Sequence, residues 1–396
     1  MLKDLAKRVQ VIKPSPTLAV SARADELKAA GKDIISLSVG EPDFDTPDHI
    51  KAAAIKAIQD GFTKYTAVDG TKSLKQAIID KLLRDNQLTY SLSQILVSCG
   101  AKHSIFNLFA AVLNPGDEVI ILAPYWVSYP DMVKLTDGIP VIITPKSNQH
   151  FKITPQQLEA AITPKTRLVM INSPSNPTGV AYSAEELKAL GDVLLKHPNV
   201  IVASDDIYEH TLWSKERFTN ILIVCPALYE RCIVINGVSK SYAMTGWRIG
   251  YAAGPANIIG AMKKIQSQST SNPTSISQVA AEAALNGDQS FIQTMIQSFK
   301  TRHDFVLSEL QKMPGVTCTP SDGTFYIFPN IQGILEKHKN FSNDIDFAEY
   351  LLSEAEVALI PGSAFGAPGY LRISYATGMD ALKKAMQRMH SAIEKL

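Results

Sequence analysis

The stretch RCIVINGVSKSYAMTGWRIGYAA, residues 231–253, sets two short apolar runs on either side of a polar loop. Both runs have the length and the Val/Ile content of buried strands. Five further runs of this kind precede them, separated by longer helical patterns. The seven strand candidates are Gln94–Ser98, Glu118–Ala123, Pro140–Thr144, Arg167–Asn172, Val200–Ser204, Arg231–Asn236 and Arg248–Ala253. This alternation predicts an α/β fold with a seven-stranded, mostly parallel sheet that helices cover on both faces.

The two ends of the chain carry other patterns. Apolar residues at helical spacing predict an amphipathic arm over the first dozen residues, which Pro14 and Pro16 end. We expect a helix over 21–30 and a short strand over 34–39 to follow. Beyond residue 282 the pattern predicts one or two long helices, with a break at Asn286-Gly287, and then short strands at 324–329, 358–360 and 371–375.

These patterns predict a large domain over residues 48–286 and a smaller α+β C-terminal domain over 287–396. Residues 1–47 should supply an N-terminal arm and part of the small domain. Within the large domain, residues 265–281 carry no charged side chain and are rich in Ser, Gln and Thr. A helix of this composition is atypical of a solvated surface, so we expect it to line a site or a subunit contact.

Composition excludes several classes of protein. The 396 residues include 39 basic and 38 acidic side chains without a basic stripe, which argues against a nucleic-acid surface. No apolar run of about 18 residues is present, and the N-terminus lacks a secretory core, so we expect no membrane span and a cytoplasmic protein. The spacing of the four cysteines predicts no metal site and suits a reducing compartment. Those cysteines are Cys99, Cys225, Cys232 and Cys318.

The loop at 237–250 contains the strongest chemical signal. Lys240 lies in a segment otherwise poor in charge, directly after an apolar strand. Loss of hydration there lowers the pKa of an ammonium and makes it nucleophilic, as Schiff-base chemistry requires. Arg248 offers a planar fork for a phosphate, and Ser239 adds a hydroxyl donor. The alternative is a surface loop with a solvated lysine.

Other polar groups follow the ends of predicted strands. Asp205 is placed to pair with a cationic ring nitrogen, and Tyr208 to donate to a phenolate-like oxygen; the alternative for Asp205 or Asp206, favoured for Asp206, is a helix N-cap. Asn176 lies between two X-Pro bonds, which predict a rigid turn; the alternative is an ordinary tight turn. Arg372 lies on a short strand, where it faces either a carboxylate or solvent.

Residues 98–103 form a strand–glycine–helix junction of the kind that binds phosphate. Lys102, in the first helical turn, opposes the helix dipole, which favours an anion nearby over a merely exposed lysine. We assign His103 a structural role. A nucleophilic lysine, a phosphate cradle, a carboxylate for a ring nitrogen and separate cations together fit pyridoxal phosphate.

Over nearly its whole length the chain resembles the fold-type I, class-I pyridoxal-phosphate aminotransferases, and within them the bacterial aspartate aminotransferases. The matching segments, in order, are Val39–Phe44, Lys64–Tyr65, Asn114–Asp117, Pro124–Trp126, Ser173–Gly179, Ser239–Gly250 and Leu371–Ala376. Asp206 stands where many relatives have Glu.

The resemblance implies a set of cofactor contacts. Lys240 forms the internal aldimine with pyridoxal phosphate and then moves the proton, with Asp205 and Tyr65 completing the catalytic group. Asp205 pairs with the pyridinium nitrogen, Tyr208 and Asn176 hydrogen-bond the phenolate oxygen, and Trp126 stacks on the ring. The residues implied around the phosphate are Gly100, Ala101, Lys102, Ser239, Arg248 and, from the partner subunit of a homodimer, Tyr65.

The resemblance also implies a substrate site. Arg372 binds the α-carboxylate, assisted by Asn176 and the backbone of Gly40, next to Trp126. Ser15, Thr17 and Lys102 meet a distal carboxylate. Lys13 matches a position associated with accepting prephenate.

The implied reaction moves the amino group of L-aspartate to 2-oxoglutarate, giving oxaloacetate and L-glutamate by ping-pong kinetics. The first alternative is a prephenate or aromatic aminotransferase, alone or bifunctional with aspartate. A pyridoxal-phosphate lyase or synthase, or a binding protein with a vestigial site, are further alternatives. A nicotinamide dehydrogenase is disfavoured because no G-x-G-x-x-G follows a first strand.

Overall fold

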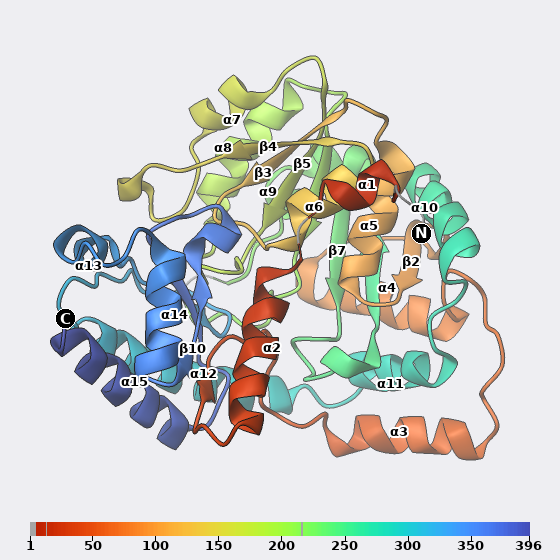
Figure 1. The fold of residues 1–396 in the computed structure, drawn as a ribbon. Coiled ribbons are helices and arrows are strands. Elements are labelled where there is room, and N and C mark those ends of the chain that lie inside the picture. Colours follow the sequence, from red (N-terminus) through yellow and green to blue (C-terminus); the bar gives the residue numbers. More distant parts are fainter. Residues whose placement is uncertain (1–4, 13, 215–216) are drawn as a thin grey trace.

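A computed structural model describes residues 5–12, 14–214 and 217–396 (Figure 1). All seven predicted strands join one sheet in the order β2-β8-β7-β6-β5-β3-β4. Neighbours pair in parallel except β8, which is antiparallel to β2 and to β7. The strands are β2 (Ile95–Ser98), β3 (Glu118–Leu122), β4 (Ile139–Ile143), β5 (Thr166–Asn172), β6 (Ile201–Asp205), β7 (Cys232–Gly237) and β8 (Gly250–Ala253). The predicted α/β fold is confirmed.

Helices cover both faces of this sheet, because side chains that alternate along each strand enter two separate apolar clusters. In β2, Ile95 and Val97 belong to one cluster and Leu96 to the other. The first cluster includes side chains of α4 (Lys72–Asn86), α7 (Pro155–Ala161), α8 (Ala184–Leu195) and α11 (Ser275–Asn286), and α3 (Asp48–Gln59) packs on α11. The second includes side chains of α5 (Ala101–Val112), α6 (Ser128–Leu135) and α10 (Ala256–Ser269).

The N-terminal segment differs in part from its prediction. A short α1 (Lys7–Gln10) lies in the predicted arm, but α2 spans Pro16–Ala29 and so begins before residue 21. Pro16 starts this helix rather than excluding it, because its missing N–H falls at the first helical position, and Ser15 caps the end by accepting from Leu18 N at 3.5 Å. Only β1 (Ile35–Ser36) forms from the predicted strand, pairing in parallel with β10 (Val357–Ala358).

The C-terminal third forms smaller sheets and a helical layer, which lie to one side of the molecule with α2 between them and the large sheet (Figure 1). The predicted break at Asn286-Gly287 is present, since α11 ends at Asn286 and α12 (Ser290–Leu310) follows. Strands β9 (Tyr326–Ile327), β11 (Ile360–Pro361) and β12 (Leu371–Ser374) form an antiparallel sheet. The helices are α13 (Gln332–Lys337), α14 (Asp344–Glu354) and α15 (Met379–Glu394), while the short α9 (Ile221–Val224) belongs to the large sheet's side.

The register of the large sheet decides where polar groups meet. Asn172 at the end of β5 pairs with Asp205 at the end of β6, and Asp205 in turn pairs with Ile235 of β7. The carboxyl ends of these strands therefore reach one edge, which faces β12 and the start of α2. In the described part of the chain, no helix has the length and apolar character needed to cross a membrane.

Gly250 tests how tightly β8 packs on the start of α5. A Cβ atom there would lie 2.1 Å from Ala101 N and 2.4 Å from the Gly100 carbonyl carbon, both backbone atoms that cannot rotate away. We expect Gly250→Ala to lower the free energy of unfolding by about 1–3 kcal/mol or more, measured by urea denaturation at fixed protein concentration.

Gly260, in the middle of α10, provides the matched control because a Cβ there meets no atom within 4 Å. Gly260→Ala should raise the free energy of unfolding by about 0.5–1 kcal/mol through helix propensity. Equal effects of the two substitutions would contradict this packing.

Candidate active site

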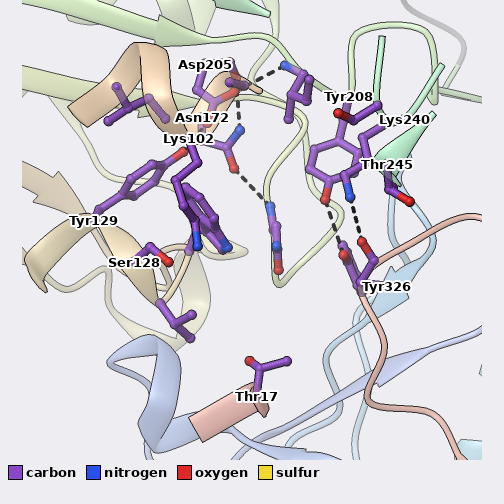
Figure 2. Close-up of a pocket in the computed structure, with 18 of the residues that line it drawn as sticks. Thr17, Lys102, Ser128, Tyr129, Asn172, Asp205, Tyr208, Lys240, Thr245 and Tyr326 are labelled. Carbon is purple, nitrogen blue, oxygen red and sulfur yellow. Dashed lines mark hydrogen bonds between the residues drawn. The ribbon is translucent and has the colours of Figure 1, made fainter. Parts of the chain in front are cut away.

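A cavity of about 310 Å³ opens at the sheet edge where β5, β6 and the loop after β7 meet α2 and β12 (Figure 2). Asp205 lies at one end of the view and Thr17 at the other. The cavity brings together most of the residues predicted from the sequence. Those that line it are Ser15, Thr17, Gly40, Ala101, Lys102, Trp126, Asn176, Asp205, Tyr208, Ser239, Lys240, Arg248 and Arg372.

Lys240 occupies the loop between β7 and β8, which returns to the sheet through a short helical turn at Thr245–Trp247. Its Nζ donates to the Gly40 carbonyl at 2.6 Å. Burial lowers the pKa of Lys240 to about 8; Glu41 and Asp205 raise it, and Arg248 and Arg372 lower it further. The side chain thus faces a cavity, and the alternative of a solvated surface lysine is wrong.

Asp205 is a buried carboxylate at the end of β6. Burial raises its pKa to about 6, and hydrogen bonds from Tyr129 Oη and from Ile207 N oppose that rise. Tyr129 was missed in the sequence. The available signal was its position in the first turn of α6, three residues after Trp126, whose ring it meets edge-on with centroids 5.3 Å apart.

The N-cap interpretation of Asp206 is wrong, because a turn rather than a helix follows β6. The buried Asp206 carboxylate instead accepts hydrogen bonds from Ser204 Oγ at 2.6 Å and from Asn220 Nδ2. Asp206 therefore does not line the cavity, and its hydrogen bonds hold Ser204 and Asn220 beside the end of β6.

Asn176 and Arg372 form the opposite wall. Arg372 donates to Asn176 Oδ1 at 3.1 Å and to the Ser38 carbonyl at 2.6 Å, and its guanidinium lies 4.5 Å from the centre of the Tyr326 ring. Its Nε is buried without a hydrogen-bond partner, and no carboxylate of the described residues pairs with it. Burial lowers the pKa of Arg372, but a guanidinium stays charged. A buried cation of this kind calls for an anion.

Two cis X-Pro bonds, Ser173-Pro174 and Asn176-Pro177, shape the turn that carries Asn176. The backbone N of Asn176 donates to Asn172 Oδ1 at 3.0 Å, and Asn172 Nδ2 donates to the Asp205 carbonyl at 2.9 Å. Asn172 was also missed. Tyr208 lies between these walls, with its Oη 3.2 Å from Tyr326 Oη.

The junction at 98–103, which we call the Gly100 cradle, places the start of α5 beside Arg248 at the cavity. Gly100 has φ 89° and caps α5, and a Cβ on it would lie 2.3 Å from Arg248 Nη2. The first amides of α5 precede its first intrahelical hydrogen bonds and are free to bind an anion. Lys102 Nζ lies 4.8 Å from the centre of the Trp126 ring, and burial and then Arg248 lower its pKa. Across the described residues, neither cation pairs with a carboxylate.

Two predicted site positions, Lys13 and Tyr65, fall outside this arrangement. Lys13 lies outside the described residues. Tyr65, on the loop between α3 and α4, is 91% exposed and does not line the cavity of its own chain. His103 accepts from Cys99 N at 3.2 Å, which agrees with its structural role.

Comparison with known proteins identifies the family. The model for aminotransferase class I and II matches residues 32–389. The chain belongs to this family. It is 58% identical to the aspartate/prephenate aminotransferase of Nitrosomonas europaea and 52% identical to the aspartate aminotransferase of Geobacillus stearothermophilus, covering 98% of this chain and 99% of each relative.

Solved structures of aminotransferases share the whole fold. The aspartate aminotransferase of Rhizobium meliloti superimposes with a TM-score of 0.96 at 49% identity, covering 99% of both chains. That of Thermus thermophilus, solved with maleate, gives 0.93 at 40% identity, covering 99% of this chain and all of that one. The likeness extends over the full length of the chain, so the fold that surrounds the cavity is that of an aminotransferase.

The lowered pKa of Lys240 can be measured on this aminotransferase without ligands. Only the neutral amine reacts with acetic anhydride, so labelling of Lys240 should rise with pH through a midpoint near 8. Peptide mass spectrometry follows the labelling, with exposed Lys337 as the internal reference. A midpoint above about 10, the ordinary range for lysine, would contradict the cavity's effect.

Proposed function

We propose that this aminotransferase binds pyridoxal phosphate and moves the amino group of L-aspartate to 2-oxoglutarate, giving oxaloacetate and L-glutamate. The observation that carries the proposal is that Arg372 and Lys102 lie on separate walls of the cavity that holds Lys240, and neither pairs with a carboxylate of the described residues. Two such cations suit a substrate with two carboxylates. Relatives named aspartate aminotransferase, one of them solved with the dicarboxylate maleate, support this choice.

The residues present fit pyridoxal phosphate. The Gly100 cradle, with Ala101, Ser239 and Arg248, offers amides, a hydroxyl and a cation for the phosphate, which leaves Lys102 for the substrate. Asp205 offers a buried carboxylate for the ring nitrogen, and Tyr208 and Asn176 offer donors for the phenolic oxygen. Trp126 offers an aromatic face. When bound, the cofactor supplies an electron sink that acidifies the substrate's α C–H bond.

Within this site Lys240 moves the proton. A pKa of about 8 leaves a useful neutral fraction near neutral pH, so Nζ is able to accept the proton from the substrate α-carbon. Arg372 orients the substrate by its α-carboxylate, with Asn176 and the Gly40 backbone beside it. Asp205 remains ionised with the help of Tyr129, since that hydroxyl donates to the carboxylate.

A homodimer with shared sites completes the proposal. Tyr65 stands exposed on its loop, and we assign it to the phosphate of the partner subunit. The large domain over 48–286 then binds the cofactor, and residues 1–47 and 287–396 form the smaller part that carries Ser15, Thr17 and Arg372. Four free cysteines suit a reducing cytoplasm.

Prephenate is the second candidate acceptor. The relative at 58% identity is named for aspartate and prephenate together. Prephenate also carries two carboxylates, so Arg372 and Lys102 suit it for the same reason as oxaloacetate. Lyase activity and a vestigial site have no such support, because the relatives described above are all named aminotransferases.

Lys240→Ala should reduce turnover by about 10²–10⁴-fold or more, because no other described side chain replaces a neutral amine at that point of the cavity. Amino-group transfer from aspartate to 2-oxoglutarate, followed over many turnovers, measures the loss. Lys337→Ala, an exposed lysine of α13, controls for the loss of a positive charge. Substantial multiple-turnover activity in Lys240→Ala would refute the assignment.

Lys102→Ala tests whether Lys102 binds the distal carboxylate of the substrate. We expect kcat/KM for aspartate, oxaloacetate and prephenate to fall about 10–100-fold, because a charge-assisted contact contributes about 1.5–3 kcal/mol. Alanine and phenylalanine should be much less affected. Equal losses for all substrates would rule out this role, and the ratio of prephenate to oxaloacetate in the native enzyme ranks the two acceptors.

A further inference from the structure

The uncharged stretch at 265–281 covers the end of α10, a turn, and the start of α11. It does not line the cavity. Instead it buries two glutamines completely, Gln266 on α10 and Gln278 on α11. A buried primary amide is costly unless its donors and acceptor are satisfied, so the partners of these two side chains indicate what they hold in place.

Gln266 fills all of its hydrogen-bonding positions. Its Nε2 donates to the carbonyls of Val68 at 2.7 Å and Val97 at 2.8 Å. Its Oε1 accepts from Ser98 Oγ at 2.7 Å and from Asn107 Nδ2 at 3.0 Å. Val97 and Ser98 end β2 and lead directly into the Gly100 cradle, whereas Val68 belongs to the loop over 62–71. One side chain thus fastens the loop to the cradle.

Gln278 binds the loop and the turn before its own helix, but not the cradle. Its Nε2 donates to Thr66 Oγ1 at 2.9 Å and to the Pro273 carbonyl at 2.8 Å, and its Oε1 accepts from Thr71 N at 2.8 Å. Ser275 Oγ adds a bond to the Phe62 carbonyl at 2.9 Å. Among the described residues, no hydrogen bond joins the Gln278 side chain to residues 98–102. Tyr65 lies between Phe62 and Thr66, the two loop residues held by Ser275 and Gln278, and its side chain is exposed.

We propose that Gln266 is a positioning residue for two cofactor sites at once. It holds the phosphate cradle of its own subunit, and through Val68 it fixes the loop that presents Tyr65 to the phosphate in the partner subunit. The inference rests on the proposed function, which supplies the cofactor and the role of Tyr65. Gln278 fixes the same loop but not the cradle, so it serves the partner's site alone.

An amide suits this position better than a charged side chain. The cradle must keep its cations and helix amides available for the phosphate, and a buried carboxylate or ammonium beside it would compete for them or repel them. A glutamine bridges three elements without adding charge.

Hybrid dimers separate the two effects. In each hybrid only one protomer keeps Lys240, and its partner carries Lys240→Ala. Pyridoxal phosphate is titrated into the cofactor-free hybrid and fixed with borohydride. Mass spectrometry then gives the phosphopyridoxyl fraction on the Lys240 protomer, a readout of binding rather than of activity.

We expect Gln266→Met, which keeps the volume but not the hydrogen bonds, to weaken binding at least fivefold when placed in either protomer. Gln278→Met should weaken binding only when placed in the Lys240→Ala protomer. Gln293→Met, the same change at an exposed position of α12, should leave binding at the level of the unmodified hybrid.

Unchanged binding with Gln266→Met in the Lys240→Ala protomer would overturn the link between the two sites, and unchanged binding with it in the Lys240 protomer would overturn the cradle role. If Gln266→Met does not fold, Gln278→Met decides: weakening from the Lys240→Ala protomer alone supports the loop's action across the dimer, and any other pattern overturns it. An unmodified hybrid that takes up no pyridoxal phosphate would refute the proposed function itself.

Discussion

The removal of Lys240 from water is the constraint on which the rest of the site depends. An ammonium in a cavity loses hydration, and the neighbouring charges decide how far its pKa falls: Glu41 and Asp205 hold it up, while Arg248 and Arg372 push it down. The resulting pKa of about 8 means that both the charged and the neutral form of Lys240 are populated near neutral pH. Without Glu41 and Asp205 the pKa would fall further, and a solvated position would leave the amine almost wholly charged near neutral pH.

The same cavity holds cations that no carboxylate of the described chain neutralises. The Arg372 guanidinium lies 4.5 Å from the centre of the Tyr326 ring and 5.0 Å from that of Phe365, and its Nε is unpaired among the described residues. Lys102 lies over Trp126 rather than beside an acid. Burying Arg372 without a counter-ion costs free energy that an anionic ligand offsets, so the unpaired cations of the cavity favour anionic substrates. Their separate walls favour a substrate with charge at both ends.

How much the sequence predicts depends on the range of the interactions concerned. The strands of the large sheet are local apolar runs, and all seven were predicted to within a few residues. The start of α2 was missed because proline was treated as a break, although at the first helical position it costs no hydrogen bond. Tyr129 and Asn172 were missed because their roles depend on side chains that the sheet register brings together. The local signal for Tyr129, its place three residues after Trp126, is one that an ordinary core tyrosine of a helix also shows.

The role of Gln266 also depends on contacts that the sequence does not show. The unusual composition of 265–281 is visible in the sequence. The hydrogen bonds of Gln266, however, reach Asn107, Ser98 and Val68, which lie about 160 to 200 residues away along the chain. A neutral amide gains little from long-range electrostatics, and its directional hydrogen bonds require that all four partners, on three elements, be in place. The bridge therefore forms only once β2, α5 and the loop over 62–71 are in place. Because this bridge joins the cradle to the loop that carries Tyr65, its loss should act on cofactor retention in both subunits.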